Sequence, residues 1–414
     1  MDKFNFITTH IHNKSRTGII STPHGDIHTP AFIFCATKAT MKGITAQQMK
    51  AAKCQIILSN TYHLDIFPSS EKVAQMGGLQ KMTGWNGPML TDSGGYQIFA
   101  MGHGSVSQEI KGKKKRWAPT LLKITEDGAT FRSYYDNSKK FLTPEKSIQI
   151  QKNLGADIIL VLDECTPYNV SKEYTEASME RSHRWSLRSI AEYKRLGIED
   201  QGLYGIIQGG TYPDLRERSI QFNNEQNDFF GIAVGGSLGS DKQTMYKTVE
   251  FTMAKIRKDK PVHLLGIGGL ADIFHGVRHG IDTFDCVHPT RLARHGSALV
   301  KAKFWRNEPS DYKPKESICL VKGRFESDIK PIDEECGCET CQGGYTRAYI
   351  HYLFKQNETV VGTLVIIHNM FFMNSMMEAI REAIKVGNID RVEDEWLVDE
   401  LKWQNRNSMN IASE

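Results

Sequence analysis

The sequence predicts a (β/α)8 barrel of the TIM type, with N-terminal antiparallel strands before it and a small C-terminal subdomain. Short apolar runs bounded by turn residues recur along the chain, as a parallel sheet covered on both faces requires. Helix-like segments separate most of these runs. A doubly wound sheet uses the same alternation and stays open as an alternative. The eight expected strands lie at residues 31–35, 55–59, 88–92, 156–163, 203–208, 230–235, 262–268 and 283–289.

Helix and hairpin signals accompany these strands. Ser171 can cap a helix over residues 172–197, and residues 240–258 have the composition of a second helix. Residues 6–30 mix polar and β-branched side chains, which predicts one or two β-hairpins in front of the barrel. The turn signals are Lys14–Ser15 and His24–Gly25.

The composition is that of an ordinary soluble globular protein. The chain has 414 residues and a formal net charge of +4, an excess too small to indicate a nucleic-acid partner by itself. The N-terminal residues lack the apolar core and cleavage site of a secretory signal. The apolar stretch at residues 364–377 is interrupted by polar side chains and is too short to span a bilayer. We therefore expect a cytoplasmic protein that does not enter the membrane.

Three cysteines within six residues predict a metal site. Cys336, Cys338 and Cys341 can reach one tetrahedral ion, and a reducing compartment favours metal binding over disulfides at this spacing. A histidine would complete a closed, structural zinc site. Both His351 and His368 follow in helix-like segments, and the spacing alone leaves the choice between them open.

Two stretches interrupt the alternation of strands and helices. Residues 100–147 contain the basic run 111–117, interpreted mainly as a solvated loop with RNA contact as the alternative, and a hairpin signal at Glu126–Asp127–Gly128. Residues 305–345 are rich in Pro, Asp and Cys and indicate an appended unit. The expected division is a catalytic barrel at residues 1–304 and 360–402, with an insertion at about 100–147, and a zinc-binding subdomain at residues 305–359.

Polar residues and glycines follow the predicted strands, where a barrel places its catalytic groups. Turn formation and helix capping explain any single one of these ends equally well. Together, however, they would converge on one mouth, where glycines let a planar ligand approach the backbone. The ends are Asp92-Ser93-Gly94-Gly95-Tyr96-Gln97, Asp163-Glu164-Cys165, Gln208-Gly209-Gly210, Gly235-Gly236-Ser237-Leu238-Gly239, and Asp285 within the eighth strand.

Carboxylates at these ends suit covalent glycosyl transfer. One carboxylate can attack an anomeric carbon while a second carboxyl group moves protons. Asp92, Asp163 and Asp285 supply the groups, and the pattern alone leaves open which one attacks.

The segment after Asp285 is basic and contains no acidic residue up to residue 306. Beside an active-site carboxylate, such a cluster suits a phosphate-bearing polymer. A solvated basic face is the alternative interpretation. The basic residues are Arg291, Arg294, Lys301, Lys303 and Arg306.

Residues 266–271 match the G-x-G-x-x-A pattern of a dinucleotide-binding loop, and Asp285 lies about twenty residues further on. The match comes late in the chain, after six strands, and its acidic residue lies among basic ones. These features disfavour a dinucleotide site.

Several long, ordered motifs resemble the tRNA-guanine transglycosylases, the queuine tRNA-ribosyltransferases of bacteria. The resemblance covers nearly the whole chain. The motifs are NTYHL (60–64), GWNGPMLTDSGGYQIF (84–99), LDECTPY (162–168), IIQGG (206–210), AVGG (233–236), GIDTFDCVHPTRLARHG (280–296), the cysteine cluster and TRAYIHYL (346–353).

The resemblance implies a zinc-bearing barrel that exchanges the wobble guanine of GU(N) anticodons for a 7-deazaguanine base, without an organic cofactor. Asp285 matches the family nucleophile, which binds the RNA covalently, and Asp92 matches the general acid/base. Tyr96 matches the ring that stacks on the base. The base-binding set is expected to comprise Ser93, Gly94, Gly95, Tyr96, Asp163, Gln208, Gly235 and Gly236.

The resemblance also implies RNA-contacting and metal-binding residues. His368, rather than His351, matches the fourth zinc ligand beside Cys336, Cys338 and Cys341. Expected RNA-contacting residues are Gly266, Gly268, Gly269, Asp272, Thr290, Arg291 and Arg294. The expected partners are tRNA with a GU(N) anticodon, the free 7-deazaguanine base and, as usual in the family, a second copy of the chain. Tyr345, Tyr349 and Tyr352 are a plausible interface element, although core packing explains them nearly as well.

The sequence departs from the bacterial pattern after Gly236. Bacterial members typically continue Leu-Ala-Val, whereas this chain has Ser237, Leu238 and Gly239, and a glycine here resembles the eukaryotic enzymes that accept queuine. We therefore expect queuine to be tolerated, with 7-aminomethyl-7-deazaguanine alone as the alternative. Cys165 remains as in bacterial members. Other classes remain open: a non-catalytic tRNA-binding partner subunit, or a different zinc-stabilised barrel such as a nucleoside or glycoside hydrolase.

Overall fold

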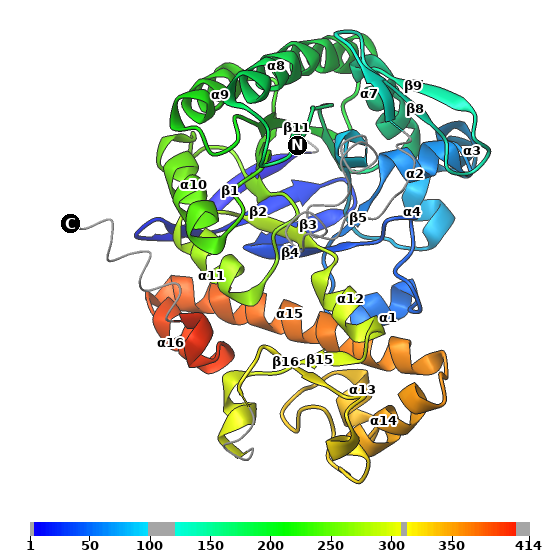
Figure 1. The fold of residues 1–414 in the computed structure, drawn as a ribbon, viewed down its shortest axis with the longest axis vertical. Coiled ribbons are helices and arrows are strands. Elements are labelled where there is room, and N and C mark those ends of the chain that lie inside the picture. Colours follow the sequence, from blue (N-terminus) through cyan, green and yellow to red (C-terminus); the bar gives the residue numbers. More distant parts are fainter. Residues whose placement is uncertain (1–3, 98–120, 308–312, 403–414) are drawn as a thin grey trace.

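Eight parallel strands close into a barrel in the computed structural model, which describes residues 4–97, 121–307 and 313–402 (Figure 1). The last strand pairs with the first, so the closed barrel is confirmed and the doubly wound sheet is excluded. Each strand overlaps a predicted run, but several are shorter than predicted; β13, for example, ends at Leu264 and not at residue 268. The strands are β4 (Ala31–Cys35), β5 (Ile57–Ser59), β6 (Met89–Thr91), β10 (Ile158–Leu160), β11 (Gly202–Ile207), β12 (Gly231–Val234), β13 (Val262–Leu264) and β14 (Thr283–Cys286).

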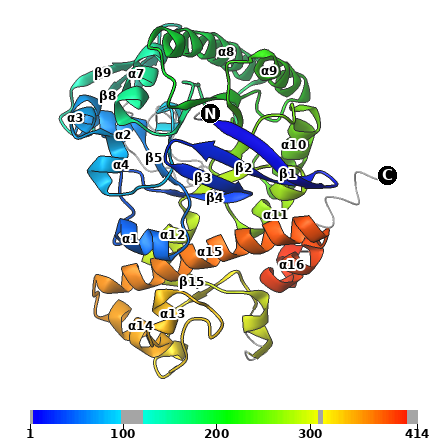
Figure 2. The same cartoon turned by 180° about the vertical axis from the view of Figure 1, so that it is seen from behind.

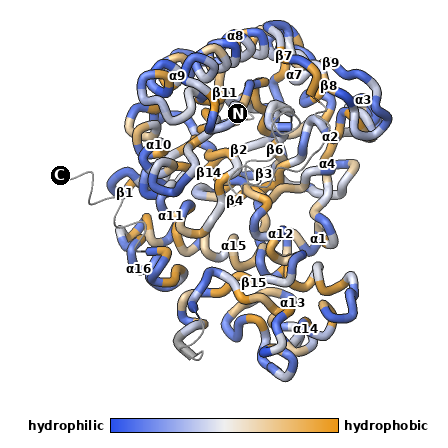
Figure 3. The backbone as a smooth tube through the Cα atoms, viewed as in Figure 1, coloured by the Kyte–Doolittle hydropathy of each residue, from blue (hydrophilic) through white to orange (hydrophobic). Residues whose placement is uncertain are grey.

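Helices surround the barrel because its strands are apolar on both faces and need an outer layer. Figure 3 shows hydrophobic residues along the barrel strands. Ser171 caps α8 as predicted, its side chain accepting a hydrogen bond from Tyr174 N, whereas Asp241 is the residue that caps α10. The helices up to the end of the barrel are α1 (Ala46–Ala51), α2 (Thr61–Ile66), α3 (Ser70–Gln75), α4 (Gly78–Thr83), α7 (Pro144–Leu154), α8 (Lys172–Arg195), α9 (Pro213–Glu225), α10 (Lys242–Lys255), α11 (Leu270–Arg278) and α12 (His288–Arg294).

An antiparallel sheet of β1 (Asn5–His12), β2 (Ser15–Thr22) and β3 (Gly25–Thr29) precedes the barrel, as predicted. It lies across the amino-terminal ends of the barrel strands (Figure 2). Arg16 of β2 donates to the buried carboxylate of Asp282, just before β14, at 2.9 Å. The opposite end of the barrel, where the strands have their carboxyl ends, carries the candidate site.

A second antiparallel sheet interrupts the barrel after β6. It comprises β7 (Leu121–Ile124), β8 (Ala129–Arg132) and β9 (Lys139–Leu142). The hairpin signal at residues 126–128 is confirmed as the β7–β8 turn, and β9 adds a strand that the sequence did not predict. The basic run 111–117 lies outside the described residues.

The C-terminal segment packs against the barrel through one long helix, α15 (Val360–Val386), which runs between the barrel and the smaller unit (Figure 1). The proposed boundary at residues 304 and 305 falls inside one strand pair, because β15 (Ser297–Leu299) pairs with β16 (Ser317–Cys319). The remaining elements are η1 (Ala302–Asn307), η2 (Gly323–Phe325), α13 (Glu339–Gln342), α14 (Arg347–Lys355) and α16 (Ile389–Trp396).

Helix α15 is longer than the apolar stretch 364–377 suggested from the sequence. By length and composition alone it could cross a membrane, but 72% of its most apolar window is buried inside the protein. Its apolar side chains are thus already used in packing the barrel against the C-terminal unit.

Candidate active site and metal centre

The polar strand ends meet at one end of the barrel. Asp92 follows β6, Gln208 follows β11, Gly235 follows β12 and Asp285 lies in β14, while Asp163 lies three residues beyond β10. Because these strands are parallel and closed into a barrel, their carboxyl ends surround a common mouth. The three carboxylates singled out in the sequence are therefore neighbours of one site.

The carboxylate of Asp285 is held on one oxygen. Its Oδ1 accepts a hydrogen bond from Gly266 N at 2.7 Å, in the loop after β13. Its Oδ2 lies 3.6 Å from the thiol of Cys35, at the end of β4. The residue is 8% exposed, so the carboxylate reaches the surface of the mouth without being fully solvated.

The Asp92 carboxyl group is partly buried and is held by hydrogen bonds on both of its oxygens. Its Oδ1 accepts from Thr61 N at 2.9 Å, and its Oδ2 accepts from the side chain of Asn60. Burial raises its pKa to about 7, and the negative charge of Asp285 acts in the same direction, while hydrogen bonds oppose the shift. A group with a pKa near neutrality can both give and take a proton under ordinary conditions.

Asp163 and Gln208 form a hydrogen-bonded pair beside these two acids. Gln208 Nε2 donates to Asp163 Oδ2 at 2.7 Å, and Ser93 Oγ donates to Asp163 Oδ1 at 3.2 Å. Burial raises the pKa of Asp163 to about 6, against the effect of these hydrogen bonds. The amide and the carboxylate together offer donors and acceptors in the arrangement that reads the edge of a planar base.

Glycines around this pair are required by close approach. A Cβ at Gly95 would lie 2.5 Å from the Asp163 carboxylate, and one at Gly236 would lie 2.8 Å from Gln208 Oε1. Gly94 and Gly236 also have positive φ angles, of 87° and 73°. Packing against Asp163 and Gln208 thus accounts for these two glycines, and the approach of a ligand to the backbone at these strand ends stays a prediction.

Arg216 is a site residue that the sequence did not indicate. It belongs to α9 and is 1% exposed, and its guanidinium donates to Gly210 O at 2.7 Å and to Gly235 O at 3.1 Å. Burial lowers its pKa to about 9. The side chain therefore ties the loop after β11 to the loop after β12. An arginine within an amphipathic helix gives no sequence signal for this role.

The residues expected to contact RNA divide into two groups. Arg291 and Arg294 are exposed on α12, directly after β14, and Gly266 has open space where a side chain would be. Thr290 and Asp272 are buried. The Asp272 carboxylate accepts from Tyr246 Oη at 2.9 Å and pairs with Lys242, so it supports the loop from beneath.

Tyr96, the residue expected to stack on the base, is 44% exposed and lies five residues after the end of β6. A half-exposed ring at the mouth presents a face to which a flat ligand can pack. The G-x-G-x-x-A loop does open a helix, α11, but it does so within a closed barrel, which excludes the dinucleotide-binding fold considered from the sequence.

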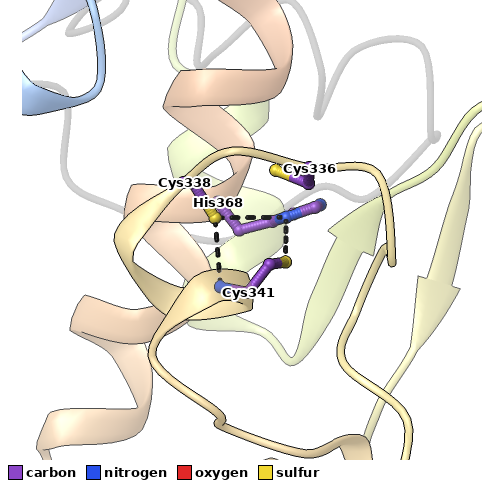
Figure 4. Close-up of side chains that lie close together, drawn as sticks. All are labelled: Cys336, Cys338, Cys341 and His368. Atoms are coloured by element: carbon purple, nitrogen blue, oxygen red, sulfur yellow. Dashed lines mark hydrogen bonds between the residues drawn. The ribbon is translucent and has the colours of Figure 1, made fainter.

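A second cluster forms a metal-binding group in the C-terminal unit. Cys336, Cys338, Cys341 and His368 are buried, and their ligand atoms lie within 4.8 Å of one another (Figure 4). His368 Nδ1 lies 3.4 Å from Cys341 Sγ and 3.8 Å from Cys338 Sγ. Its Nε2 lies 2.9 Å from Leu299 O, which fixes the ring and directs Nδ1 at the thiols. This donor set fits a closed tetrahedral metal site.

The structure also decides between the two candidate histidines. His351 Nδ1 lies 2.9 Å from Leu320 O, and His351 is not part of the cluster. His368 is therefore the fourth member of the metal-binding group, as the family resemblance implied.

Barrel, mouth and metal-binding group together define an enzyme of the (β/α)8 class. A sequence profile described as queuine tRNA-ribosyltransferase matches residues 12–401. The queuine tRNA-ribosyltransferase of Roseiflexus sp. (strain RS-1) is 41% identical over 397 residues, which cover 93% of this chain and 96% of the relative. That of Halothermothrix orenii is 40% identical over 395 residues, covering 95% and 96%. The chain belongs to the queuine tRNA-ribosyltransferase family.

Proposed function

We propose that this tRNA-guanine transglycosylase of queuosine modification replaces the wobble guanine of GU(N) anticodons with a free 7-deazaguanine base, through a covalent enzyme–RNA intermediate. Family membership supports the class of reaction. The observation that carries the mechanism is the presence of two acids at one mouth, Asp285, which Gly266 N holds through one oxygen, and Asp92, whose pKa is raised to about 7.

In the first step, an oxygen of Asp285 bonds to C1′ of the ribose while the bond from C1′ to N9 of guanine breaks. The leaving base takes the electron pair and receives a proton from Asp92. In the second step, Asp92 takes a proton from the incoming base, whose nitrogen attacks C1′ and releases the Asp285 carboxylate. Two displacements retain the configuration at the sugar carbon.

Base recognition is assigned to the pocket that Asp163 and Gln208 build. A 7-deazaguanine presents two N–H donors and one carbonyl acceptor on its pairing edge, which suit the Asp163 carboxylate and the donors of Gln208 and the Gly236 backbone. Tyr96 would stack on the ring. The remaining assigned residues, which shape the backbone of the pocket, are Ser93, Gly94, Gly95 and Gly235.

RNA binding is assigned to the rim beside β14. Arg291 and Arg294 are exposed on α12 and can bind phosphates, with the loop from Gly266 to Asp272 on the other side of the nucleophile. Within that loop, Gly266, Gly268 and Gly269 bring the backbone close to the RNA, and Asp272 and Thr290 act as supports. Arginine forks are suited to this role because they grip phosphate with two hydrogen bonds.

Queuine tolerance is retained as a proposal, with 7-aminomethyl-7-deazaguanine as the alternative base. A Cβ at Gly239 would lie 2.6 Å from Cγ2 of Thr244, so packing against α10 accounts for this glycine independently of base size. A direct assay decides: the enzyme and its cognate tRNA are incubated with each free base. Absence of queuine incorporation beside robust use of the aminomethyl base would reject the proposal.

The metal proposed for the Cys3His group is zinc, one structural ion per subunit, because three thiolates and an imidazole prefer Zn2+. The proposed location is the cytoplasm, and the proposed assembly is a homodimer. Tyr349 and Tyr352, 45% and 55% exposed on α14, support an interface better than core packing. The division of the chain at residues 305–359 is likewise a proposal.

Trapping of the intermediate tests the function. An anticodon stem-loop with a GU-beginning anticodon is incubated with the enzyme and then denatured, and an RNA adduct is expected on the gel. Asp285→Asn should form none, because an amide oxygen is a poor nucleophile. A wild-type enzyme with neither adduct nor guanine exchange would instead indicate a non-catalytic tRNA-binding subunit.

A further inference from the structure

A buried histidine lies directly behind the proposed nucleophile. His263 is in β13 and pairs in register with Thr283 of β14. Because side chains alternate along a strand, Thr283 and Asp285 point to the same face of β14, towards the imidazole. His263 is completely buried, so its polar atoms must find partners within the protein.

The two ring nitrogens of His263 differ, because Nδ1 has a hydrogen-bond partner and Nε2 has none among the described residues. His263 Nδ1 lies 2.9 Å from Thr283 Oγ1. Its Nε2 lies 3.2 Å from Asp285 Oδ1 but forms no hydrogen bond with any described residue in this structure. A small rotation of the ring would complete an Nε2–H···Oδ1 hydrogen bond, and a buried polar atom left unpaired favours that movement.

The two oxygens of Asp285 therefore have different surroundings. Oδ1 accepts from Gly266 N at 2.7 Å and faces His263. Oδ2 faces the weak thiol donor of Cys35 at 3.6 Å. The less strongly held oxygen is the better nucleophile, whereas the held oxygen becomes the carbonyl oxygen of the sugar ester.

We propose that His263 is a positioning residue that holds Oδ1 of Asp285 and thereby stabilises the carboxylate when it leaves C1′. The inference rests on the proposed covalent mechanism. When the incoming base attacks, the C1′–Oδ2 electron pair returns to Asp285, and negative charge spreads onto Oδ1. Hydrogen bonds to a charged oxygen are stronger than those to an ester carbonyl, so this donor favours release over adduct.

The proposal predicts a split between the two half-reactions. Formation of the adduct and its discharge by added guanine are timed separately, in single turnover, with an anticodon stem-loop. His263→Phe should slow discharge about tenfold, as loss of a hydrogen bond to a charged group implies, without slowing formation. His263→Gln, which can place an N–H near the same point, should restore discharge to nearly the wild-type rate.

Controls separate this role from packing. Thr283→Val removes only the hydroxyl that orients the ring. It should also slow discharge, by a smaller factor than His263→Phe. This second variant keeps the test decisive if His263→Phe folds poorly. Equal slowing of both half-reactions, or unchanged discharge in folded variants, would overturn the role of His263. A wild-type enzyme that forms no adduct would overturn the proposed function instead.

Discussion

At the scale of single residues, the site depends on one carboxyl group whose burial is unfavourable for folding. Asp92 is ionised in the unfolded chain above its ordinary pKa, whereas burial raises the folded pKa to about 7. Between these two values the folded state binds the extra proton, so its contribution to stability falls as the pH rises. Burial of this proton donor therefore makes the fold less stable at neutral pH.

Asp92→Asn should therefore raise the melting temperature while removing most exchange activity. The gain should be largest above pH 7, with an upper bound of about 4 kcal/mol, and should shrink as the pH falls towards 4. Thermal unfolding of both proteins across this range measures it. An asparagine variant that is less stable at pH 8 would contradict the charge-based explanation.

The same group predicts how the first half-reaction depends on pH. Adduct formation needs protonated Asp92, so its single-turnover rate should fall as the pH rises through about 7. The residual rate of Asp92→Asn should lose this dependence. A wild-type rate that stays flat between pH 6 and pH 8 would exclude Asp92 as the acid.

At the scale of elements, loops are held in place by side chains that belong to helices. Arg216 of α9 bridges the loops after β11 and β12, and both loops line the pocket assigned to the base. Its acceptors are backbone carbonyl groups, and no neighbouring side chain can take the place of the Arg216 donor without movement. The arrangement of the two loops proposed to bind the base therefore depends on a residue of a helix.

Arg216→Ala should lower the free energy of unfolding by about 3 kcal/mol, because two buried carbonyl oxygens lose their donor. It should also raise KM for the free base. Arg218→Ala in the same helix is the matched control, since that exposed side chain pairs with surface acids and should change stability by less than about 1 kcal/mol. Urea unfolding measures both. Equal effects would refute the bridging role.

The metal-binding group gives a second test at this scale. His368→Gln should abolish metal binding and lower the melting temperature, because a structural metal site contributes directly to folding. His351→Gln should retain the metal, since that ring contacts a backbone carbonyl instead. Metal analysis of the purified variants measures the difference. Loss of metal from the His351 variant alone would reverse the assignment.

At the scale of the whole molecule, the two ends of the barrel have separate tasks. The N-terminal sheet ties the amino-terminal ends of the strands through Arg16 and Asp282. The carboxyl ends carry the acids, and α12 adds exposed arginines beside them. A net charge of only +4 therefore leaves RNA affinity to local charge at this rim.

Arg291→Ala should weaken binding of the stem-loop and reduce the slope of log K against log salt by about 1. Arg257→Ala is the matched control, because Arg257 precedes β13 at the other end of the barrel and pairs with Asp259. Binding measured by titration at several salt concentrations tests the pair. Similar slopes for both variants would place the RNA elsewhere.

The sequence predicted the structural features that recur along the chain and the residues that occur at a fixed place within them. The eight strands were readable because a buried parallel strand is apolar throughout, and Asp285 could be placed because it lies at the end of one. The choice of His368 over His351 required the resemblance, since spacing alone is satisfied by both. Arg216 gave no signal because its partners are backbone carbonyl groups. His263 gave none because Asp285 lies about twenty positions away and is brought close only by the pairing of β13 with β14.

One turn of α15 connects the metal-binding group to α12, the helix that carries the exposed Arg291 and Arg294. Beside His368, the Asn369 amide donates to Pro289 O of α12 at 2.9 Å and accepts from Leu299 N at 2.9 Å. A cell starved of the metal would then make enzyme whose acids are intact but whose arginine-bearing helix has lost its anchor. Such an enzyme would keep the arrangement of its acids but bind RNA less tightly, so the metal-binding group would influence tRNA affinity from outside the proposed active site.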